Sequence, residues 1–196
     1  MSRGLRVTGG SFGGRRLKVP LRNARPTSDR VRESLFARLT DLEGARVLDV
    51  FAGSGALGIE ALSRGADSVV FLEQAAHCTE VLRDNLHSLD LESRTTVVRG
   101  DALRGIARLG REGRCFDLIL LDPPYQGEHA ELALQVLVKA GVLAEGAMVV
   151  VERSRRHALP LAAGLELLDE RRYGETLISR YQPVDPGDDG PGQEET

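Results

Sequence analysis

The sequence predicts an α/β fold with a seven-stranded, mostly parallel sheet that ends in an antiparallel hairpin and is preceded by a small N-terminal β-hairpin. Three observations predict it. Short apolar runs alternate with amphipathic segments from residue 45 to 152, which is typical of a parallel sheet covered by helices on both faces. After Glu152 the alternation stops, and two strand-like segments flank Tyr173-Gly174. Before residue 25, two basic strand-like segments flank a glycine-rich turn.

Size and composition narrow the class of protein. The chain has 196 residues, enough for one domain with a hydrophobic core. It has no apolar run of the ~18 residues that a membrane span needs, and its N-terminus has no apolar segment typical of a signal peptide. Cys78 and Cys115 are far apart and lack metal-ligand spacing, so we expect reduced thiols that fill the core of a cytoplasmic protein, and no metal site.

The N-terminal elements are a hairpin and a helix. Residues 4–8 and 15–19 are the expected strands, joined by GGSFGG. The segment RPTSDRVRESLFARL then predicts an amphipathic helix, with Ser28 as its N-cap and with arginines on the face opposite its apolar residues. The apolar face carries Val31, Leu35 and Leu39.

The alternating region predicts five strands, and a helix follows each of the first four. The expected strands are 45–51, 68–73, 95–100, 116–122 and 146–152, and the expected helices are 55–65, 75–89, 101–113 and 128–141. Two further strands around Tyr173-Gly174 close the sheet in antiparallel orientation.

Charge is unevenly distributed along the chain. Residues 1–38 hold ten basic and two acidic side chains, a net charge of +8, which leaves −11 for the rest of a chain whose total is −3. Such asymmetry suggests a polyanionic partner, although charge alone suits a solvated arm equally well. We therefore divide the chain into a basic hairpin extension (1–24), a main domain (25–182) and an acidic tail (183–196) that we expect to be disordered.

A glycine-rich turn follows the first strand of the alternating region. Gly53, Gly55 and Gly58 form G-x-G-x-x-G between a strand and a helix, where the backbone can approach a ligand closely. The next strand ends in Glu73, whose carboxylate can accept hydrogen bonds from both hydroxyls of a ribose. These residues suit either a nicotinamide dinucleotide or S-adenosylmethionine.

Two acids favour S-adenosylmethionine. Asp49, in the turn ahead of Gly53, would repel a pyrophosphate but attract the ammonium of a methionine moiety. Asp101 ends the third strand, where it can accept from an adenine amino group and also cap the following helix.

The segment LILLDPPYQG carries the reaction chemistry. Its apolar run ends in Asp122, followed by Pro123, Pro124 and Tyr125. The Asp122 carboxylate and a nearby carbonyl can accept from an exocyclic amine and localise its lone pair, and the two prolines hold these acceptors rigidly. Tyr125 offers an aromatic face on which a base can stack.

An Asp-Pro-Pro-Tyr motif with an upstream FAGSG loop resembles S-adenosylmethionine-dependent amino-methyltransferases. Three further stretches resemble the RsmD family, the bacterial 16S rRNA (guanine-N2)-methyltransferases: RVTGGSFGGRRLKVP, RPTSDRVRESLF (25–36) and YGETLISRY (173–181). The resemblance covers roughly residues 3–182, and RPTSDRVRESLF is its most specific part.

The resemblance implies a Rossmann-like class I methyltransferase that acts on guanine N2 in 16S rRNA or in an assembling small subunit. Nothing in the sequence demands a dimer, so we expect a monomer, with no membrane partner. The resemblance implies that the target base is held by Asp122, Pro123, Pro124 and Tyr125. It implies that the cofactor is lined by Asp49, Phe51, Gly53, Gly55, Glu73, Asp101 and Ala102, with Thr27 and Arg30 at its methionine end. The charge pattern adds candidate RNA phosphate contacts at Arg3, Arg6, Arg15, Arg16, Lys18 and Arg22.

Three other functions remain open. A DNA adenine-N6 methyltransferase would need a separate domain to read sequence, and 196 residues leave little room for it. A nicotinamide-dependent oxidoreductase is disfavoured by Asp49 and by the Asp-Pro-Pro-Tyr motif. A non-catalytic ribosome assembly factor is disfavoured by the intact cofactor and base-binding residues.

Overall fold

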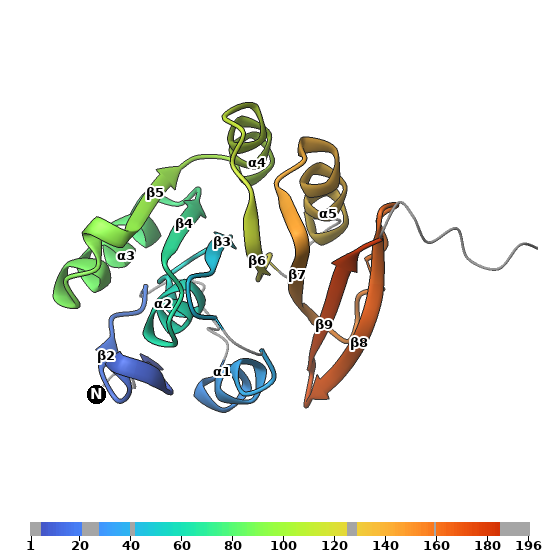
Figure 1. The fold of residues 1–196 in the computed structure, drawn as a ribbon. Coiled ribbons are helices and arrows are strands. Elements are labelled where there is room, and N and C mark those ends of the chain that lie inside the picture. The colour runs from blue at the N-terminus through green and yellow to red at the C-terminus, as the bar shows by residue number, and fades with distance from the viewer. Residues whose placement is uncertain (1–4, 21–27, 40–41, 125–128, 159, 185–196) are drawn as a thin grey trace, which may run out of the picture.

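The computed structural model describes residues 5–20, 28–39, 42–124, 129–158 and 160–184. Its main sheet has seven strands in the order β5-β4-β3-β6-β7-β9-β8 (Figure 1). These strands are β3 (Arg46–Val50), β4 (Ser68–Glu73), β5 (Thr95–Arg99), β6 (Phe116–Leu121), β7 (Leu143–Ser154), β8 (Leu165–Tyr173) and β9 (Thr176–Pro183). The helices are α1 (Asp29–Phe36), α2 (Ala56–Ser63), α3 (Ala76–Ser88), α4 (Ala102–Arg111) and α5 (His129–Ala140), with a 3-10 turn η2 (Glu92–Arg94).

The direction of the strands confirms the predicted fold. Strands β3 to β7 run parallel, and β9 and β8 complete the sheet antiparallel to their neighbours. The chain builds outward from β3 through β4 to β5 and then returns to place β6 on the other side of β3. Strand order therefore reverses between β3 and β6, the place where open α/β sheets bind ligands.

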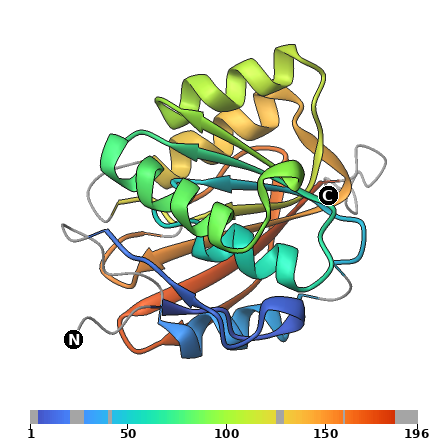
Figure 2. The same cartoon turned by 90° about the vertical axis from the view of Figure 1, so that its left-hand side faces the viewer.

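Alternate residues of each strand enter two separate hydrophobic clusters. In β3, Val47 packs with the N-terminal hairpin and with α1, α2 and α3, whereas Leu48 and Val50 pack with α4 and α5. Figure 2 shows α4 and α5 on one side of the sheet and α2, α1 and the hairpin on the other. Burial on both faces explains why the central strands are continuous apolar runs.

The N-terminal hairpin packs directly on the main domain. It consists of β1 (Leu5–Arg6), a 3-10 turn η1 (Gly10–Phe12) and β2 (Arg16–Leu17), with Leu5 paired to Leu17. Leu5 and Leu17 lie in the same hydrophobic cluster as α2. All eight residues of α2 are buried, because the sheet covers one side of this helix and the hairpin lies on the other.

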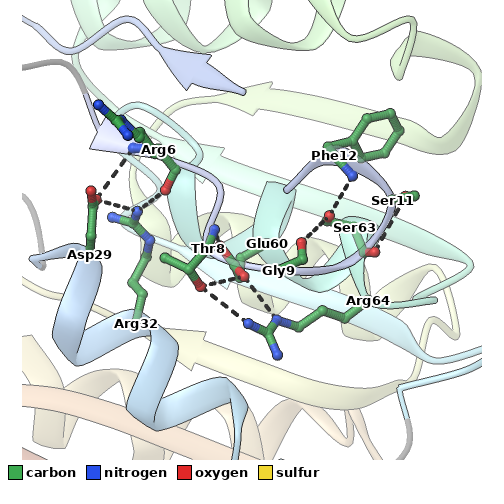
Figure 3. Close-up of polar contacts among 10 residues, drawn as sticks. All are labelled: Arg6, Thr8, Gly9, Ser11, Phe12, Asp29, Arg32, Glu60, Ser63 and Arg64. Carbon is green, nitrogen blue, oxygen red and sulfur yellow. Dashed lines mark hydrogen bonds and ion pairs between the residues drawn. The ribbon is translucent and has the colours of Figure 1, made fainter. Parts of the chain in front are cut away.

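Helix α1 departs from the prediction in one respect. The Ser28 hydroxyl caps it as predicted, accepting from the backbone N–H of Val31 at 3.3 Å. Its arginines were expected on the face opposite the apolar residues, but Arg32 is fully buried. The Arg32 guanidinium donates to the Arg6 carbonyl and, at 2.8 Å, to Asp29, because the hairpin passes over this side of the helix (Figure 3).

The C-terminal hairpin is anchored on α1. The hydroxyls of Ser34 and Tyr173 are hydrogen-bonded at 2.7 Å, and Asp169 accepts from both Arg38 and Arg180. Two of the stretches that resemble the RsmD family therefore contact each other. Strand β9 extends to Pro183, the first residue of the predicted tail, and residues 185–196 lie outside the described part of the chain.

Candidate functional site

A cleft of about 610 Å³ lies at the C-terminal ends of β3, β4, β5 and β6. Its volume is in the range of small-molecule and cofactor sites. Most of the residues that the sequence nominates for the cofactor and the base meet in this cleft. They are Asp49, Phe51, Gly53, Glu73, Asp101, Ala102, Asp122, Pro123 and Pro124.

Asp49 is the most deeply enclosed acid of the cleft. It lies within β3 rather than in the turn where the sequence suggested it, and it is 1% exposed. Its Oδ2 accepts from the backbone N–H of Gly58 at 2.9 Å. Burial raises the pKa of Asp49 to about 7, the Gly58 hydrogen bond opposes this shift, and the charge of Glu73 adds to it. A cation in the cleft would favour the ionised carboxylate.

The glycine-rich turn has the backbone shape that its sequence requires. Phe51 has a φ of 65°, an uncommon value for a residue with a side chain, and Gly55 has a φ of 80° at the N-cap of α2. A Cβ on Gly55 would lie 2.2 Å from Leu82 Cδ1, so Gly55 lets the turn approach α3 behind the cleft. Gly53 has open space beside its Cα and lines the cleft itself.

Two carboxylates lie at the C-terminal ends of β4 and β5. Glu73 accepts from the backbone N–H of Gly53 at 2.8 Å and from that of Ala75 at 2.7 Å, which fixes its side chain beside the turn. Asp101 caps α4 through Oδ1, which accepts from Arg104 N at 2.9 Å. Each carboxylate oxygen can accept more than one hydrogen bond, so both side chains retain capacity for a ligand.

The acid–proline turn lies beside β3. The backbone N–H of Asp122 donates to Val50 O at 3.5 Å, a long hydrogen bond that continues the β3–β6 pairing beyond the strand. Pro123 is buried and Pro124 is exposed. Across the same cleft, the rings of Phe51 and His129 meet edge to face, with centroids 6.4 Å apart.

The remaining nominated residues lie elsewhere or outside the described part. Thr27 and Tyr125 are outside the described residues, as are Arg3 and Arg22 of the hairpin region. Arg30 is exposed and is not among the residues that line the cleft, whereas Arg32, two positions further on, lines it. Because the arginines of α1 alternate around the helix, the sequence did not indicate which of them faces inward.

The basic side chains of the hairpin are exposed. Arg6, Arg15, Arg16 and Lys18 are all on the surface. The Lys18 ammonium pairs with Asp84 of α3 at 2.8 Å, and the Arg15 guanidinium donates to Ser88 O at 3.0 Å. Both contacts are with α3, so two of the basic side chains of the hairpin already have partners on that helix.

Several lining residues were missed by sequence reasoning. Cys78 was expected in the core but is partly exposed and lines the cleft, and Cys115 is also partly exposed. Burial, with a smaller effect of the Glu73 charge, raises the pKa of the Cys78 thiol to about 11. The thiol is therefore uncharged at neutral pH where it lines the cleft. His129 and Leu132 of α5 also line the cleft, and the only sequence signal for them was their position shortly after the Asp-Pro-Pro motif.

The model of the family described as "Conserved hypothetical protein 95" matches residues 5–182. The chain belongs to this family. "Ribosomal RNA small subunit methyltransferase D" of Escherichia coli K12 is 36% identical over 181 residues, which are 91% of this chain and 89% of that protein. The protein of the same name from Haemophilus influenzae is 35% identical over 182 residues, 91% of this chain and 93% of its own length. The resemblance to the RsmD family is thereby confirmed.

Solved structures agree with this family and with the predicted fold class. The structure named "Putative methyltransferase yhhF from Escherichia coli" has a TM-score of 0.82 and 33% identity, covering 92% of this chain and 98% of that one. The Thermus thermophilus hypothetical protein TTHA0928 has a TM-score of 0.78 and 31% identity, covering 90% and 98%. The structure named "Crystal structure of SMU.776, a putative methyltransferase complexed with SAH" shares the fold, with a TM-score of 0.65 at 14% identity, covering 78% of this chain and 48% of that one.

Among the residues that the structure describes, no three metal-ligating side chains gather at one point. No helix in this described part of the chain combines the length and the apolar composition that crossing a bilayer requires.

Proposed function

We propose that this protein transfers a methyl group from S-adenosylmethionine to the exocyclic N2 of a guanine in 16S rRNA of the small ribosomal subunit. The observation that carries the proposal is the position of Asp122-Pro123-Pro124, which opens onto the same cleft as Asp49, Glu73 and the glycine-rich turn. The names of the relatives, which are 35–36% identical, support rRNA as the substrate class.

The cleft residues fit S-adenosylmethionine. Asp49 is a buried carboxylate of β3, hydrogen-bonded to the backbone of α2, and is able to pair with the ammonium of the methionine moiety. Glu73 would accept from the ribose hydroxyls, and Asp101 from the adenine amino group. When bound, the cofactor supplies an electrophilic methyl group. Gly53 allows the backbone of the turn to lie close to the cofactor, because Gly53 has no side chain between them.

Asp122 would activate the target amine. The lone pair of an exocyclic amine is delocalised into the purine ring, which makes that nitrogen a poor nucleophile. Acceptors at its hydrogens, the Asp122 carboxylate and a neighbouring carbonyl, draw the hydrogens into their plane and localise the lone pair on nitrogen. The prolines fix the turn so that this geometry exists before the base arrives.

The hairpin would bind the rRNA backbone. The exposed Arg6, Arg15, Arg16 and Lys18 suit phosphate contacts, which position RNA without reading its sequence. The target guanine must leave its stack to reach the cleft, which favours a loop or an unpaired base as substrate. Tyr125, Thr27 and Arg30 remain candidates for base stacking and for the methionine end of the cofactor.

The first test is the substitution Asp122→Ala, together with Asp122→Asn. We expect kcat for methyl transfer to 16S rRNA to fall by about 10²-fold or more, because the acceptor at the amine is lost or weakened. Binding of S-adenosylhomocysteine, read from the rise in melting temperature, should be nearly unchanged, and NADH should give no rise in any variant.

The matched control is Glu112→Ala, which removes a carboxylate at the C-cap of α4 that pairs with Arg108 away from the cleft. Its kcat should equal that of the wild type. Retention of the wild-type kcat in Asp122→Ala would contradict the proposed role of Asp122, and a melting shift with NADH instead of S-adenosylhomocysteine would contradict the proposed cofactor.

A further inference from the structure

Asn85 connects the basic hairpin to the cofactor turn. Its side chain is 1% exposed on α3. Its Oδ1 accepts from the backbone N–H of Lys18 at 2.8 Å, and its Nδ2 donates to Lys18 O at 3.0 Å and to Ser54 O at 2.9 Å. One buried amide thus uses its acceptor and both of its N–H donors on two segments that lie far apart in the sequence.

The two segments belong to different binding surfaces. Lys18 directly follows β2, its side chain lies on the basic surface, and Pro20 just beyond it lines the cleft. Ser54 lies between Gly53 and Gly55 in the cofactor turn and also lines the cleft. Asn85 therefore fixes the backbone of the candidate RNA-binding element to the backbone of the candidate cofactor-binding turn.

Residues 8–12 of the hairpin are hydrogen-bonded to α2 and not to the cofactor turn (Figure 3). Thr8 donates from both its backbone N–H and its hydroxyl to the buried Glu60 of α2, each at 2.7 Å. Ser63 Oγ accepts from Phe12 N at 2.9 Å and donates to Gly9 O at 2.5 Å. Glu60 and Ser63 lie on the body of α2, so these contacts hold the hairpin in place without touching the cofactor turn.

We propose that Asn85 is a positioning residue that makes cofactor binding and RNA binding cooperative. The inference rests on the proposed function. Cofactor contacts restrict the turn around Ser54, and the Asn85 amide transmits this restriction to the backbone at Lys18. The backbone at Lys18 is then already restricted when phosphates bind the hairpin, so RNA binding loses less conformational entropy. By linkage, RNA strengthens cofactor binding by the same factor.

The coupling factor is the ratio of the Kd for one ligand in the absence of the other ligand to the Kd in its presence. It can be measured in the full chain. The probes are naked 16S rRNA and small subunits, both from cells that lack this activity, and S-adenosylhomocysteine as the cofactor analogue. The Kd for RNA is measured with and without saturating S-adenosylhomocysteine, and the Kd for S-adenosylhomocysteine with and without RNA. In the wild type we expect both ratios to be equal and at least about 5-fold.

Two substitutions of Asn85 test its role. Asn85→Asp keeps the acceptor for Lys18 N but places an oxygen against the carbonyls of Lys18 and Ser54. Asn85→Ala removes all three hydrogen bonds without adding a charge, and it serves if the buried aspartate prevents folding. In either variant the coupling factor should fall to within about 2-fold of unity.

Ser63→Ala is the matched control, because it loosens the hairpin on α2 without touching the cofactor turn. It should weaken RNA binding with and without S-adenosylhomocysteine alike and keep the wild-type coupling factor. A merely structural Asn85 would behave as Ser63 does, so a coupling factor retained in both Asn85 variants overturns the inference.

A coupling factor of one in the wild type also overturns the inference. If that wild type still methylates 16S rRNA, the proposed function stands and the coupling alone is wrong. If the wild type neither binds nor methylates rRNA, the proposed function and the coupling through Asn85 are both wrong.

Discussion

Asp49 shows how a single buried acid can make stability depend on pH. Its pKa is raised from 3.8 to about 7, chiefly because burial disfavours the charged form. Between these two pH values the folded state holds a proton that the unfolded state has lost. The contribution of Asp49 to stability is therefore fully present below about pH 4 and is lost as the pH rises through about 7.

We therefore predict that Asp49→Asn stabilises the free protein at pH 8. The amide oxygen can still accept from Gly58 N, and the cost of a buried charge disappears. The melting temperature should rise by several degrees at pH 8 and by much less at pH 4, as measured by calorimetry. The same substitution should weaken S-adenosylmethionine binding by about 10-fold or more, because the ammonium loses its charged partner.

Asp117 serves as a control because its pKa is shifted in the opposite direction to that of Asp49. Asp117 has a lowered pKa, mainly because its side chain is hydrogen-bonded to Arg46. Asp117→Asn should therefore lower the melting temperature at neutral pH, and its effect should shrink as the pH falls. If both substitutions shift stability with the same sign across this range, the account of Asp49 is wrong.

At the scale of elements, α2 connects the two candidate binding surfaces. Its N-terminus begins at Gly55 in the cofactor turn, and its body carries Glu60 and Ser63, which hold the hairpin. The helix needs polar residues on the side away from the sheet because the hairpin backbone approaches it there with N–H groups that require acceptors. The candidate RNA-binding hairpin is thereby held in a fixed position relative to the cleft.

We predict that charge reversal of Arg15 and Arg16 to Glu weakens 16S rRNA binding and leaves the affinity for S-adenosylhomocysteine in the absence of RNA unchanged. Both side chains are exposed on the hairpin. If each contacts one phosphate, the slope of log K against log salt should decrease in magnitude by roughly 1.5. Filter binding over a salt series, together with calorimetric titration of S-adenosylhomocysteine, measures both quantities.

The matched control is the double reversal of Arg108 and Arg111 to Glu on α4, which covers the other face of the sheet. This double reversal changes the net charge by the same amount as the reversal of Arg15 and Arg16, but it should leave the slope of log K against log salt unchanged. Equal weakening by both double variants would mean that overall charge, and not the hairpin, attracts the RNA.

At the scale of the whole molecule, the sequence predicted the features that depend on neighbouring residues, such as the bounds of strands and the residues at strand ends. The strand expected at 68–73 is β4 residue for residue, and the acids after the strands meet in one cleft because parallel strands end at the same edge. Chain direction and hydrophobic periodicity suffice for such predictions.

Contacts between distant segments were not predictable in the same way. The burial of Arg32, and the hydrogen bonds of Glu60 and Asn85, depend on where the hairpin lies on α1, α2 and α3. A helical pattern indicates which face is apolar but not which segment covers the opposite face. A polar residue such as Glu60 in an otherwise apolar helix is the signal that would have indicated a covering element.

The measurement that tests the central claim most directly is the identity of the methylated nucleoside. Purified protein is incubated with methyl-labelled S-adenosylmethionine and with naked 16S rRNA, partly assembled small subunits or duplex DNA, all from cells that lack this activity. The nucleic acid is then digested and its nucleosides are separated. We predict label in N2-methylguanosine from an rRNA substrate and none with Asp122→Ala. Label in N6-methyladenine of DNA would contradict the proposed substrate, and no label in any nucleoside despite cofactor binding would contradict a catalytic role and favour an assembly factor.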